Sequence, residues 1–491
     1  MKQNLSFLFG KDHPAVQEKS FIVLPGQNCI RITIDTSLKQ GLYTVLYVYA
    51  PSHCLRAMRQ VGYGERILQI GEEIGLCSSG ACPGLVKEGT WTIRAVIYNR
   101  IEQSADQEAA LLLTISEAAG EIGERAGEEQ WMNQDGTIVF PERSIIRCTP
   151  GWYAGDFHVH THLSDGQETM TVQNWKAEFM GLSFFMVTEH NVMPFSWMKS
   201  QILAIPSIEI TSSEGHCNLF GLHACVNDPD RCCWDHEHAD ALLSEAALGA
   251  HRQNALVSIN HPFLSPWSWQ HEDFQISELD CLEVINDPTY PDNQAANQNA
   301  IALLDCLWND GYQITALGGS DTHRKLDDWY PGADGPSIIG DPATWVYCSV
   351  LSAQAILDGV RAGHTMISRN CVPSVCLLFQ NMEILPGSEV RGSGQLRAEI
   401  ILQKCRRPLQ FYAVYDGVRT KLSQHQDMSE RTCMAVCSMQ WESGAHWLRF
   451  EAADEDGMIC FLTNPVFSGR KEHAFKTIGE AMAEIRAQEK L

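Results

Sequence analysis

The chain has 491 residues, which is enough for about two or three domains. Its 60 acidic side chains outnumber the 36 basic ones and give a formal net charge of -24 at pH 7. A protein that binds long nucleic acids needs a track of basic side chains for the phosphates, so this balance argues against a polynucleotide partner.

The amino terminus has no charged segment followed by a long apolar one, and no apolar run in the chain is long enough to span a membrane. We therefore expect a cytoplasmic protein that does not act at a membrane. In that compartment the 18 cysteines are expected to be free thiols, most of them buried.

The first part of the chain reads as short strands of alternating apolar and polar residues, separated by Gly and Pro. The expected strands are residues 20–24, 30–34, 43–49, 90–98 and 110–115. This pattern is typical of an antiparallel β-sandwich, which we expect over residues 1–147. The acidic, Gly-containing stretch 117–134 is expected to be a linker or an exposed loop.

The most informative feature follows, where two histidines are separated by one residue. In a strand, residues i and i+2 point to the same face, so His158 and His160 are expected to project together. Asp165 follows in an acidic turn with Ser164 and Gly166. Two imidazoles and a nearby carboxylate suit a divalent transition metal such as Zn, Mn or Fe, although paired histidines on a strand also occur in purely structural roles.

The same kind of residue recurs after later apolar runs, at residues 184–188, 202–208, 255–259 and 314–317. The ligand-type residues at or beyond the ends of these runs are His190, Glu209, His216, His261, Asp321 and His323. Helical patterns lie between the runs, at residues 172–181, 241–250 and 295–308. Strands that alternate with helices and end in polar residues are typical of a parallel α/β barrel.

In the first of these helices, Val172, Trp175 and Phe179 are spaced as one face, and Gly181 is expected to end the helix.

These dispersed motifs resemble the polymerase and histidinol phosphatase (PHP) family of metallohydrolases, and the segments 151–161, 164–166 and 319–323 resemble its carbaryl-hydrolase-like branch. The resemblance covers roughly residues 150–370. It implies an α/β fold with a distorted (β/α)7 TIM-like barrel, which we expect over residues 148–370. Elements at 343–350, 353–361 and 365–368 would close it. We expect residues 371–491 to form a small β-sandwich-like domain with a terminal helix near 476–487, in which Ile478, Met482 and Ile485 share one face.

The resemblance also implies two to three divalent metal ions. The first ion would take His158, His160, Glu209 and Asp321; Glu209 would bridge to a second ion, held also by His216 and His261. A third would take Asp165, His190 and His323. The family usually has Asp where this chain has Glu189. We expect Glu189 to orient its neighbour His190 rather than bind a metal. Glu214 and Glu283 are expected to be structural or to support the ligands from outside rather than to bind a metal.

The expected chemistry is hydrolysis of a small-molecule ester, because metals that share a carboxylate can activate water near neutral pH. A phosphoester is our first expectation, with Asp165 and His323 in catalytic roles and Arg324 placed to meet a phosphate. Lys325 is the next cation, and the alternative for Arg324 and Lys325 is an ordinary pair of surface residues. A carboxylic-ester or carbamate hydrolase with the same metal core is the rival enzyme, and a non-catalytic, metal-stabilised binding protein is the third hypothesis.

Aromatic residues bear on the choice of substrate. Those in the loops of the barrel are Trp197, Trp267, Trp269, Trp329 and Tyr330. They would either give the site an apolar mouth suited to an aryl leaving group or clamp loops together.

Five other histidines are expected at the surface or in packing roles: His162, His223, His236, His238 and His251. His236 and His238 lie near Cys232 and Cys233, where adventitious metal binding is the alternative. The oligomeric state is left open.

Overall fold

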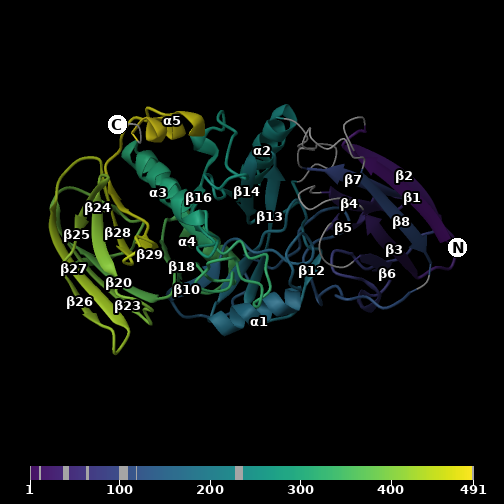
Figure 1. The fold of residues 1–491 in the computed structure, drawn as a ribbon, viewed down its shortest axis with the longest axis horizontal. Helices are drawn as coiled ribbons and strands as arrows, with labels where there is room; N and C mark the ends of the chain where they lie inside the picture. Colours follow the sequence, from purple (N-terminus) through teal and green to yellow (C-terminus); the bar gives the residue numbers. More distant parts are fainter. Residues whose placement is uncertain are drawn as a thin grey trace.

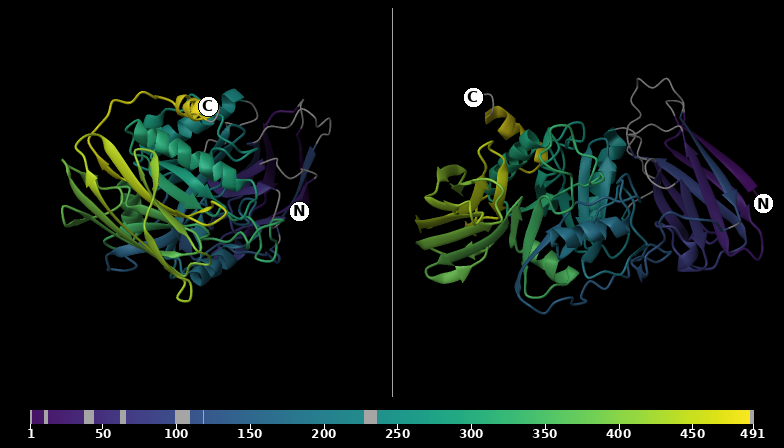
Figure 2. Two further views of the ribbon diagram at one scale, coloured as in Figure 1. Left: turned by 60° about the vertical axis from the view of Figure 1, so that its left-hand side comes forward. Right: turned by 60° about the horizontal axis from the view of Figure 1, so that its bottom comes forward.

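The computed structural model describes residues 2–9, 13–36, 44–61, 66–98, 109–117, 119–226 and 236–488. The fold is mixed α/β and consists mostly of strands. Two N-terminal sheets lie at one end, the C-terminal strands lie at the other, and a curved sheet with its helices lies between them (Figure 1). The turned views show the same order of parts (Figure 2). Within the described ranges, no helix is both long and apolar enough to cross a membrane.

The N-terminal strands form two antiparallel sheets that share one core. One sheet has the order β1-β8-β3-β6 and the other has the order β2-β7-β4-β5. Their bounds are β1 Lys2–Phe9, β2 Val16–Val23, β3 Cys29–Thr36, β4 Thr44–Tyr49, β5 Leu55–Val61, β6 Ile67–Gly71, β7 Gly89–Ile97 and β8 Ala109–Ser116. Buried side chains from both sheets, Phe7 and Trp91 among them, form one hydrophobic cluster. The five predicted strands are confirmed, although residue 43 lies outside the described residues. A β-sandwich domain over 1–147 stays a prediction.

The central sheet carries the strands that were expected to form the barrel. They are β10 Gly151–Asp156, β11 Phe184–Val187, β13 Leu203–Ser212, β14 Gly215–Phe220, β15 Leu256–Ile259, β16 Cys281–Asn286 and β17 Thr315–Gly319. The pairs β10–β11, β11–β13, β15–β16 and β16–β17 are parallel, whereas β14 is antiparallel to both of its neighbours. The sheet is therefore a mixed half-barrel, and the seven-fold (β/α) repeat is not observed. The reason is local: the turn between Ser212 and Gly215 is too short for the crossover that a parallel connection requires.

Curvature brings the β17 edge of this sheet back towards its middle. A parallel bridge joins Val159 to Thr322, and the Gly318 N–H donates to Oγ1 of Thr344 over 2.9 Å. Gly319 approaches His158 so closely that a Cβ on it would lie 2.4 Å from the His158 Cβ. The segments that follow β10 and β17 are thus held side by side.

Four helices accompany the central sheet: α1 Met170–Met180, α2 His236–His251, α3 Asn293–Asn309 and α4 Ala353–Arg361. Each predicted helix is confirmed to within a few residues. Thr169 caps α1 by accepting from the Val172 N–H, and Gly181 ends it in the left-handed region with φ of 74°.

The face of α1 that carries Trp175 and Phe179 is exposed. Trp175 is 54% exposed and Phe179 is 71% exposed, and the two rings stack on each other at the surface. The opposite face is buried and includes Gln173, Lys176 and Ala177. The two polar residues are buried because they bind the loops of the site described below.

The C-terminal strands fall into two sheets around one core. The strands β18 Ala343–Cys348, β19 Thr365–Ser368, β29 Ile459–Thr463, β28 His446–Ala453, β24 Gln410–Tyr415 and β25 Val418–Lys421 continue the central sheet. The second sheet has the order β21-β20-β23-β27-β26, with bounds β20 Val372–Phe379, β21 Met382–Ile384, β23 Gly394–Gln403, β26 Gln424–Asp427 and β27 Thr432–Trp441. Because β19 pairs with β29, one sheet runs across the expected boundary at residue 370.

The short elements complete the chain. They are β9 Glu129–Gln130, which pairs with β12 Ser196–Trp197, then β22 Glu389–Val390, β30 Val466–Ser468 and the 3-10 turns Ile74–Leu76 and Ile276–Glu278. The final helix α5 spans Ile478–Gln488. Its residues Ile478, Met482 and Ile485 are buried, as predicted.

Candidate metal centre

All nine predicted ligand residues gather at one end of the central sheet. His158, His160 and Asp165 follow β10, His190 follows β11, and His261 follows β15. Glu209 lies on β13 and His216 on β14, whereas Asp321 and His323 follow β17. The side chains are almost fully buried, except that Asp165, Asp321 and His323 remain 14%, 16% and 26% exposed. Those three therefore mark the side on which the cluster opens to solvent.

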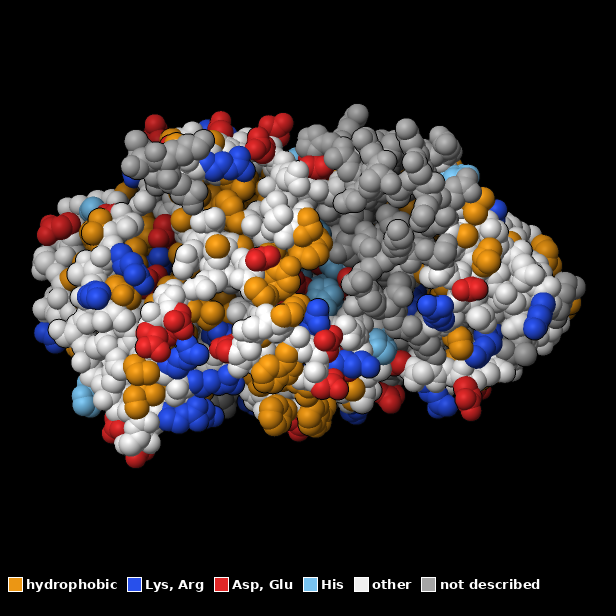
Figure 3. All heavy atoms as spheres, viewed as in Figure 1, with side chains coloured by type: hydrophobic (Ala, Val, Ile, Leu, Met, Phe, Trp, Pro, Cys, Tyr) orange, Lys and Arg blue, Asp and Glu red, His pale blue; other side chains and the backbone are white. Residues whose placement is uncertain are grey.

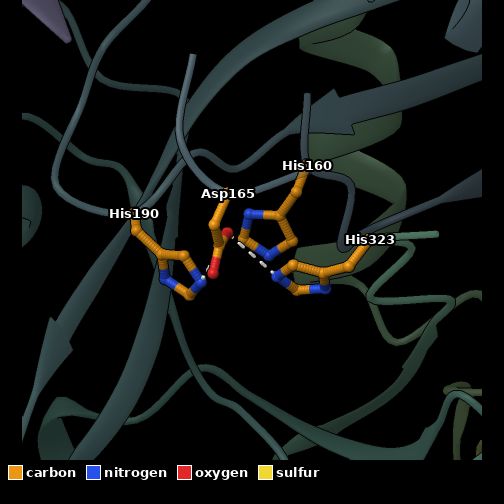
Figure 4. A group of neighbouring side chains, drawn as sticks. All are labelled: His160, Asp165, His190 and His323. Atoms are coloured by element: carbon orange, nitrogen blue, oxygen red, sulfur yellow. Dashed lines mark ion pairs between the residues drawn. The ribbon is translucent and has the colours of Figure 1, made fainter. Parts of the chain in front are cut away.

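The most open group consists of His160, Asp165, His190 and His323, which point towards one another (Figure 4). Asp165 Oδ1 lies 3.3 Å from His190 Nε2 and 3.1 Å from His323 Nε2. Ligand atoms of the four residues all lie within 4.8 Å of one another, which is close enough to share one ion. In the space-filling view, histidine atoms are visible in a recess near the middle of the face, beside hydrophobic side chains (Figure 3).

Glu209 is fully buried, and its carboxylate lies within 3.7 Å of five imidazoles, those of His158, His160, His190, His216 and His261. Its Oε1 is 3.2 Å from His158 Nε2 and 3.1 Å from His216 Nδ1, and its Oε2 is 2.6 Å from His190 Nδ1. His261 Nε2 is more distant, at 3.7 Å. Such a position suits a carboxylate that bridges two ions.

Asp321 lies across the cluster from Glu209. Its Oδ1 is 3.3 Å from His158 Nε2 and 3.1 Å from His160 Nε2, and these three residues form a second potential ion site. The backbone of Asp321 adopts a positive φ of 48° and its N–H donates to the His158 carbonyl over 2.8 Å. This fixed backbone aims the carboxylate at the two strand histidines.

Glu283, which was expected to be structural or to support the ligands from outside, is part of the surroundings of the cluster. Its Oε1 accepts from His158 Nδ1 over 3.0 Å, and its Oε2 accepts from the His261 N–H over 2.9 Å. Asn286 Nδ2 donates to the same oxygen over 3.1 Å. The carboxylate therefore holds a proton on His158 Nδ1 and leaves its Nε2 lone pair for the cluster. His158, His261 and Glu283 are themselves close enough to form a third potential ion site.

Glu189 does not face the other ligands. Its carboxylate accepts from the backbone N–H groups of Thr161 and Ser164, over 3.1 and 3.2 Å, and from both hydroxyls. Burial raises its pKa, and these hydrogen bonds lower it in part. Glu189 thus holds the turn that leads to Asp165, and its expected role in orienting His190 stays a prediction.

The inner face of α1 contacts two ligand-bearing loops. Gln173 Nε2 donates to the His160 carbonyl over 2.9 Å. The fully buried Lys176 pairs with Glu168 at 2.9 Å and donates to the Arg324 carbonyl over 3.3 Å. Hydrophobic periodicity did not indicate that Gln173 and Lys176 are buried, because they are buried against polar backbone groups rather than apolar side chains.

Several ligand atoms are buried but lack a hydrogen-bond partner of good geometry. They are the Nε2 atoms of His158 and His160, Oδ1 of Asp165 and Asp321, and Oε2 of Glu209. Leaving such polar atoms unpaired in a protein interior is costly, and a bound cation would satisfy all of them at once. This donor set therefore fits divalent metal ions.

The charges of the side chains agree with such a site. Burial lowers the pKa of His160 to about 3 and, despite the pull of Glu209, lowers that of His216 to about 4. Burial would also raise the pKa of Glu209, but His190 and His158 hold it well below its usual value. His160 and His216 are therefore neutral imidazoles and Glu209 is a carboxylate at neutral pH, whereas neighbouring carboxylates raise the pKa values of His158, His190 and His323 despite their burial.

Arg324 lies at the exposed rim, directly after His323. Its guanidinium covers the ring of Tyr330 at 4.2 Å and pairs with Asp328 at 2.8 Å. Tyr330 in turn meets Tyr290 edge to face, with ring centroids 5.0 Å apart. The ion pair with Asp328 and the contact with Tyr330 hold Arg324 beside the cluster.

The predicted aromatic mouth is only partly present. Trp197 and Trp269 are buried: Trp197 stacks on Trp131, and the Nε1 of Trp269 donates to the His271 carbonyl. These two tryptophans clamp loops. Trp329 is 50% exposed and lies in the same loop as Tyr330.

The histidines expected outside the site take other partners. His162 Nε2 bonds to the Gln167 carbonyl, His223 is exposed beside Glu142, and His251 contacts Asp280. His236 and His238 begin α2, but their side chains lie outside the described residues, as do Cys232 and Cys233.

Comparison of the sequence with models of known families and with curated proteins finds no match. Among solved structures, the fold is similar to a crystal structure of a two-domain protein from Bacteroides vulgatus that contains a predicted PHP-like metal-dependent phosphoesterase. The two share 17% identity, with a TM-score of 0.34, over 71% of this chain and 99% of that one. At these values the likeness does not decide function.

The fold and the site together define a mixed α/β protein with a buried histidine–carboxylate cluster suited to divalent metals. What such a cluster does has to be inferred from its residues.

Proposed function

We propose that the protein is a metal-dependent hydrolase of the PHP type that acts on a small phosphoester and holds two to three divalent ions, Zn, Mn or Fe. One observation carries the proposal: buried nitrogen and oxygen atoms of His158, His160, Asp165, Glu209 and Asp321 converge at one end of the sheet as close ion pairs, without hydrogen bonds of good geometry. A purely structural cluster would pair these atoms with one another in good geometry.

The chain's own hydrogen bonds prepare the histidines for this role. His158 Nδ1 faces Glu283 and His323 Nδ1 faces the Asp321 carbonyl, at 3.0 and 2.7 Å. A proton held on Nδ1 leaves Nε2 of each ring as a lone-pair donor towards the centre. Ions bound there would lower the pKa of a coordinated water and polarise the scissile ester.

His323 and Asp165 are the ligands that a substrate would meet first, because they lie on the exposed side of the cluster. Arg324 adds a fixed positive charge at the same rim, where it can offset the charge of a phosphoester. We therefore assign the catalytic roles to Asp165, His323 and Arg324. Of these three, Arg324 would contact the substrate but would not bind a metal ion.

A carboxylic-ester or carbamate hydrolase is the second candidate. The edge-to-face pair of Tyr290 and Tyr330, together with the half-exposed Trp329, gives the rim an apolar side that would accept an aryl leaving group.

Elemental analysis of the purified chain, followed by turnover of p-nitrophenyl phosphate and p-nitrophenyl acetate with each metal restored, tests the proposal. Two or more metals per chain with phosphate-ester turnover supports it, and acetate turnover alone favours the second candidate. Full metal content without any hydrolysis indicates a metal-stabilised binding protein. Less than one metal per chain, not restorable by Zn, Mn or Fe, overturns the metal centre.

Two variants sharpen the test. Glu209→Gln keeps the shape of the side chain but removes the charge that five imidazoles share, so metal content and turnover should both fall. His162→Ala is the matched control, because this histidine lies in the Asp165 loop but contacts the Gln167 carbonyl instead.

A further inference from the structure

The N-terminal sheets contact the central region at two particular loops. One is the turn at 161–166, which carries Asp165, and the other is the segment that carries His190. Buried residues of the N-terminal region, including Tyr47, Met58 and Tyr98, belong to one hydrophobic cluster with Leu163 and Val192. The other strand-borne ligands, such as Glu209 and His216, are held by the central sheet itself.

At the His190 loop, the contact is a chain of hydroxyl groups. Tyr47 and Tyr98 are fully buried, and their hydroxyls lie 2.7 Å apart. The Tyr47 hydroxyl donates to the Asn191 carbonyl over 3.2 Å. Asn191 adopts a positive φ of 53°, and its side-chain amide bonds to both backbone groups of Thr211. The residue next to His190 is thus fixed from two sides.

At the Asp165 loop, the contact is made by β5. The Arg59 guanidinium donates to the His162 carbonyl over 3.1 Å, and the Gln60 N–H donates to the Leu163 carbonyl over 3.0 Å. Gly80 packs against Leu163 so tightly that a Cβ on it would lie 2.8 Å from that side chain. Backbone and side chains of the N-terminal region therefore set the path of the turn that leads to Asp165.

We propose that the N-terminal region is a working part of the metal centre, and that Tyr47 and Arg59 are positioning residues for the ion held by His160, Asp165, His190 and His323. Two of those four ligands stand on the loops that this region holds. Asp165 Oδ1 lies only 3.1–3.3 Å from two imidazoles, so a small shift of either loop would separate the ligands. This inference rests on the proposed metal-dependent function.

The test is Mn²⁺ binding to the complete chain after removal of metal with EDTA, by equilibrium dialysis and elemental analysis. Tyr47→Phe removes one hydroxyl, and Arg59→Met removes the donor to His162. Loss of a hydrogen bond that supports a ligand typically weakens metal affinity about 10- to 100-fold. In each variant we therefore expect one Mn²⁺ per chain, the ion of this four-ligand group, to bind at least about tenfold less tightly. The other Mn²⁺ should bind as before.

Matched variants separate positioning from folding. Tyr49→Phe makes the same change on β4, where the ring faces Arg94 rather than a ligand loop. Arg59→Lys keeps a donor and should recover part of the lost affinity. The melting temperature of each EDTA-treated protein reports any general loss of stability. If Tyr47 and Arg59 were merely structural, their variants would melt at a lower temperature without a selective change in Mn²⁺ affinity.

The outcomes are distinct. The inference is supported if the affinity for one Mn²⁺ falls selectively in Tyr47→Phe and Arg59→Met but not in Tyr49→Phe. Unchanged affinities in both variants, or equal weakening of every Mn²⁺, overturn it while the metal centre stands. A wild-type chain that binds no Mn²⁺, Zn²⁺ or Fe²⁺ overturns the proposed function itself.

Discussion

Glu283 holds His158 by its Nδ1 nitrogen, at 3.0 Å, although it belongs to a different strand of the central sheet. The same carboxylate accepts the backbone N–H of His261. One buried acid therefore orients two of the proposed ligands and determines which nitrogen of His158 is available.

Glu283→Gln should weaken metal binding without removing a ligand. The amide would place a donor against the His261 N–H or against His158 Nδ1, so one buried hydrogen bond is lost. We expect roughly tenfold weaker affinity for the ion at His158, measured by metal titration of the EDTA-treated chain. Unchanged affinity would show that Glu283 has no part in orienting His158.

His323→Ala should lower turnover far more than it lowers thermal stability. The side chain is 26% exposed, so little packing is lost, whereas a ligand at the open side of the cluster disappears. We expect turnover of the preferred ester to fall by roughly a hundredfold or more. If melting temperature and activity fall together, the cluster is mainly structural; His162→Ala should retain its full metal content.

Glu124→Gln should change how stability depends on pH. Burial raises the pKa of Glu124 to about 7, although the N–H groups of Met170 and Thr171 lower it in part. The unfolded chain ionises this group near pH 4.5, so the wild type loses stability as pH rises from about 4.5 to about 7, on the order of 3 kcal/mol. Glutamine does not titrate.

Urea unfolding of both EDTA-treated proteins between pH 4.5 and 8 checks this prediction. The stability of the variant relative to the wild type should increase over that interval and then level off. A constant difference would mean that Glu124 keeps an ordinary pKa in the folded protein.

Substitutions on the two faces of α1 should lower the free energy of unfolding by very different amounts. Lys176→Met leaves Glu168 without its buried partner and should cost on the order of 3 kcal/mol of unfolding free energy. Phe179→Ser, on the face that is 71% exposed at this residue, should cost no more than about 0.5 kcal/mol. Urea denaturation measures both, and equal costs would contradict the observed orientation of the helix.

The sequence allowed the ligand cluster to be predicted because each ligand adjoins a short apolar run, and such runs mark strands wherever they pair. His158 and His160 also follow the two-residue period of a strand. The pairing partners were not predictable in this way: the reversal at Ser212 to Gly215 depends on a two-residue turn, and it converts the expected parallel repeat into a mixed sheet.

The residues that support the cluster from outside were harder to predict, for a physical reason. Gln173 and Lys176 are buried against backbone groups of other loops, so their role depends on tertiary contacts that hydrophobic periodicity does not encode. The same holds for Tyr47 and Arg59, which lie more than a hundred residues from the loops they contact.

The pairing of β19 with β29 has a consequence for how the chain can be divided. A polypeptide cut after residue 370 would retain β19 but expose its backbone N–H and C=O groups along a bare edge. Exposed edges of this kind recruit other strands, so such a fragment is expected to self-associate rather than remain monomeric. The shared sheet also predicts that the central and C-terminal strands melt in one cooperative transition, not as two independent units.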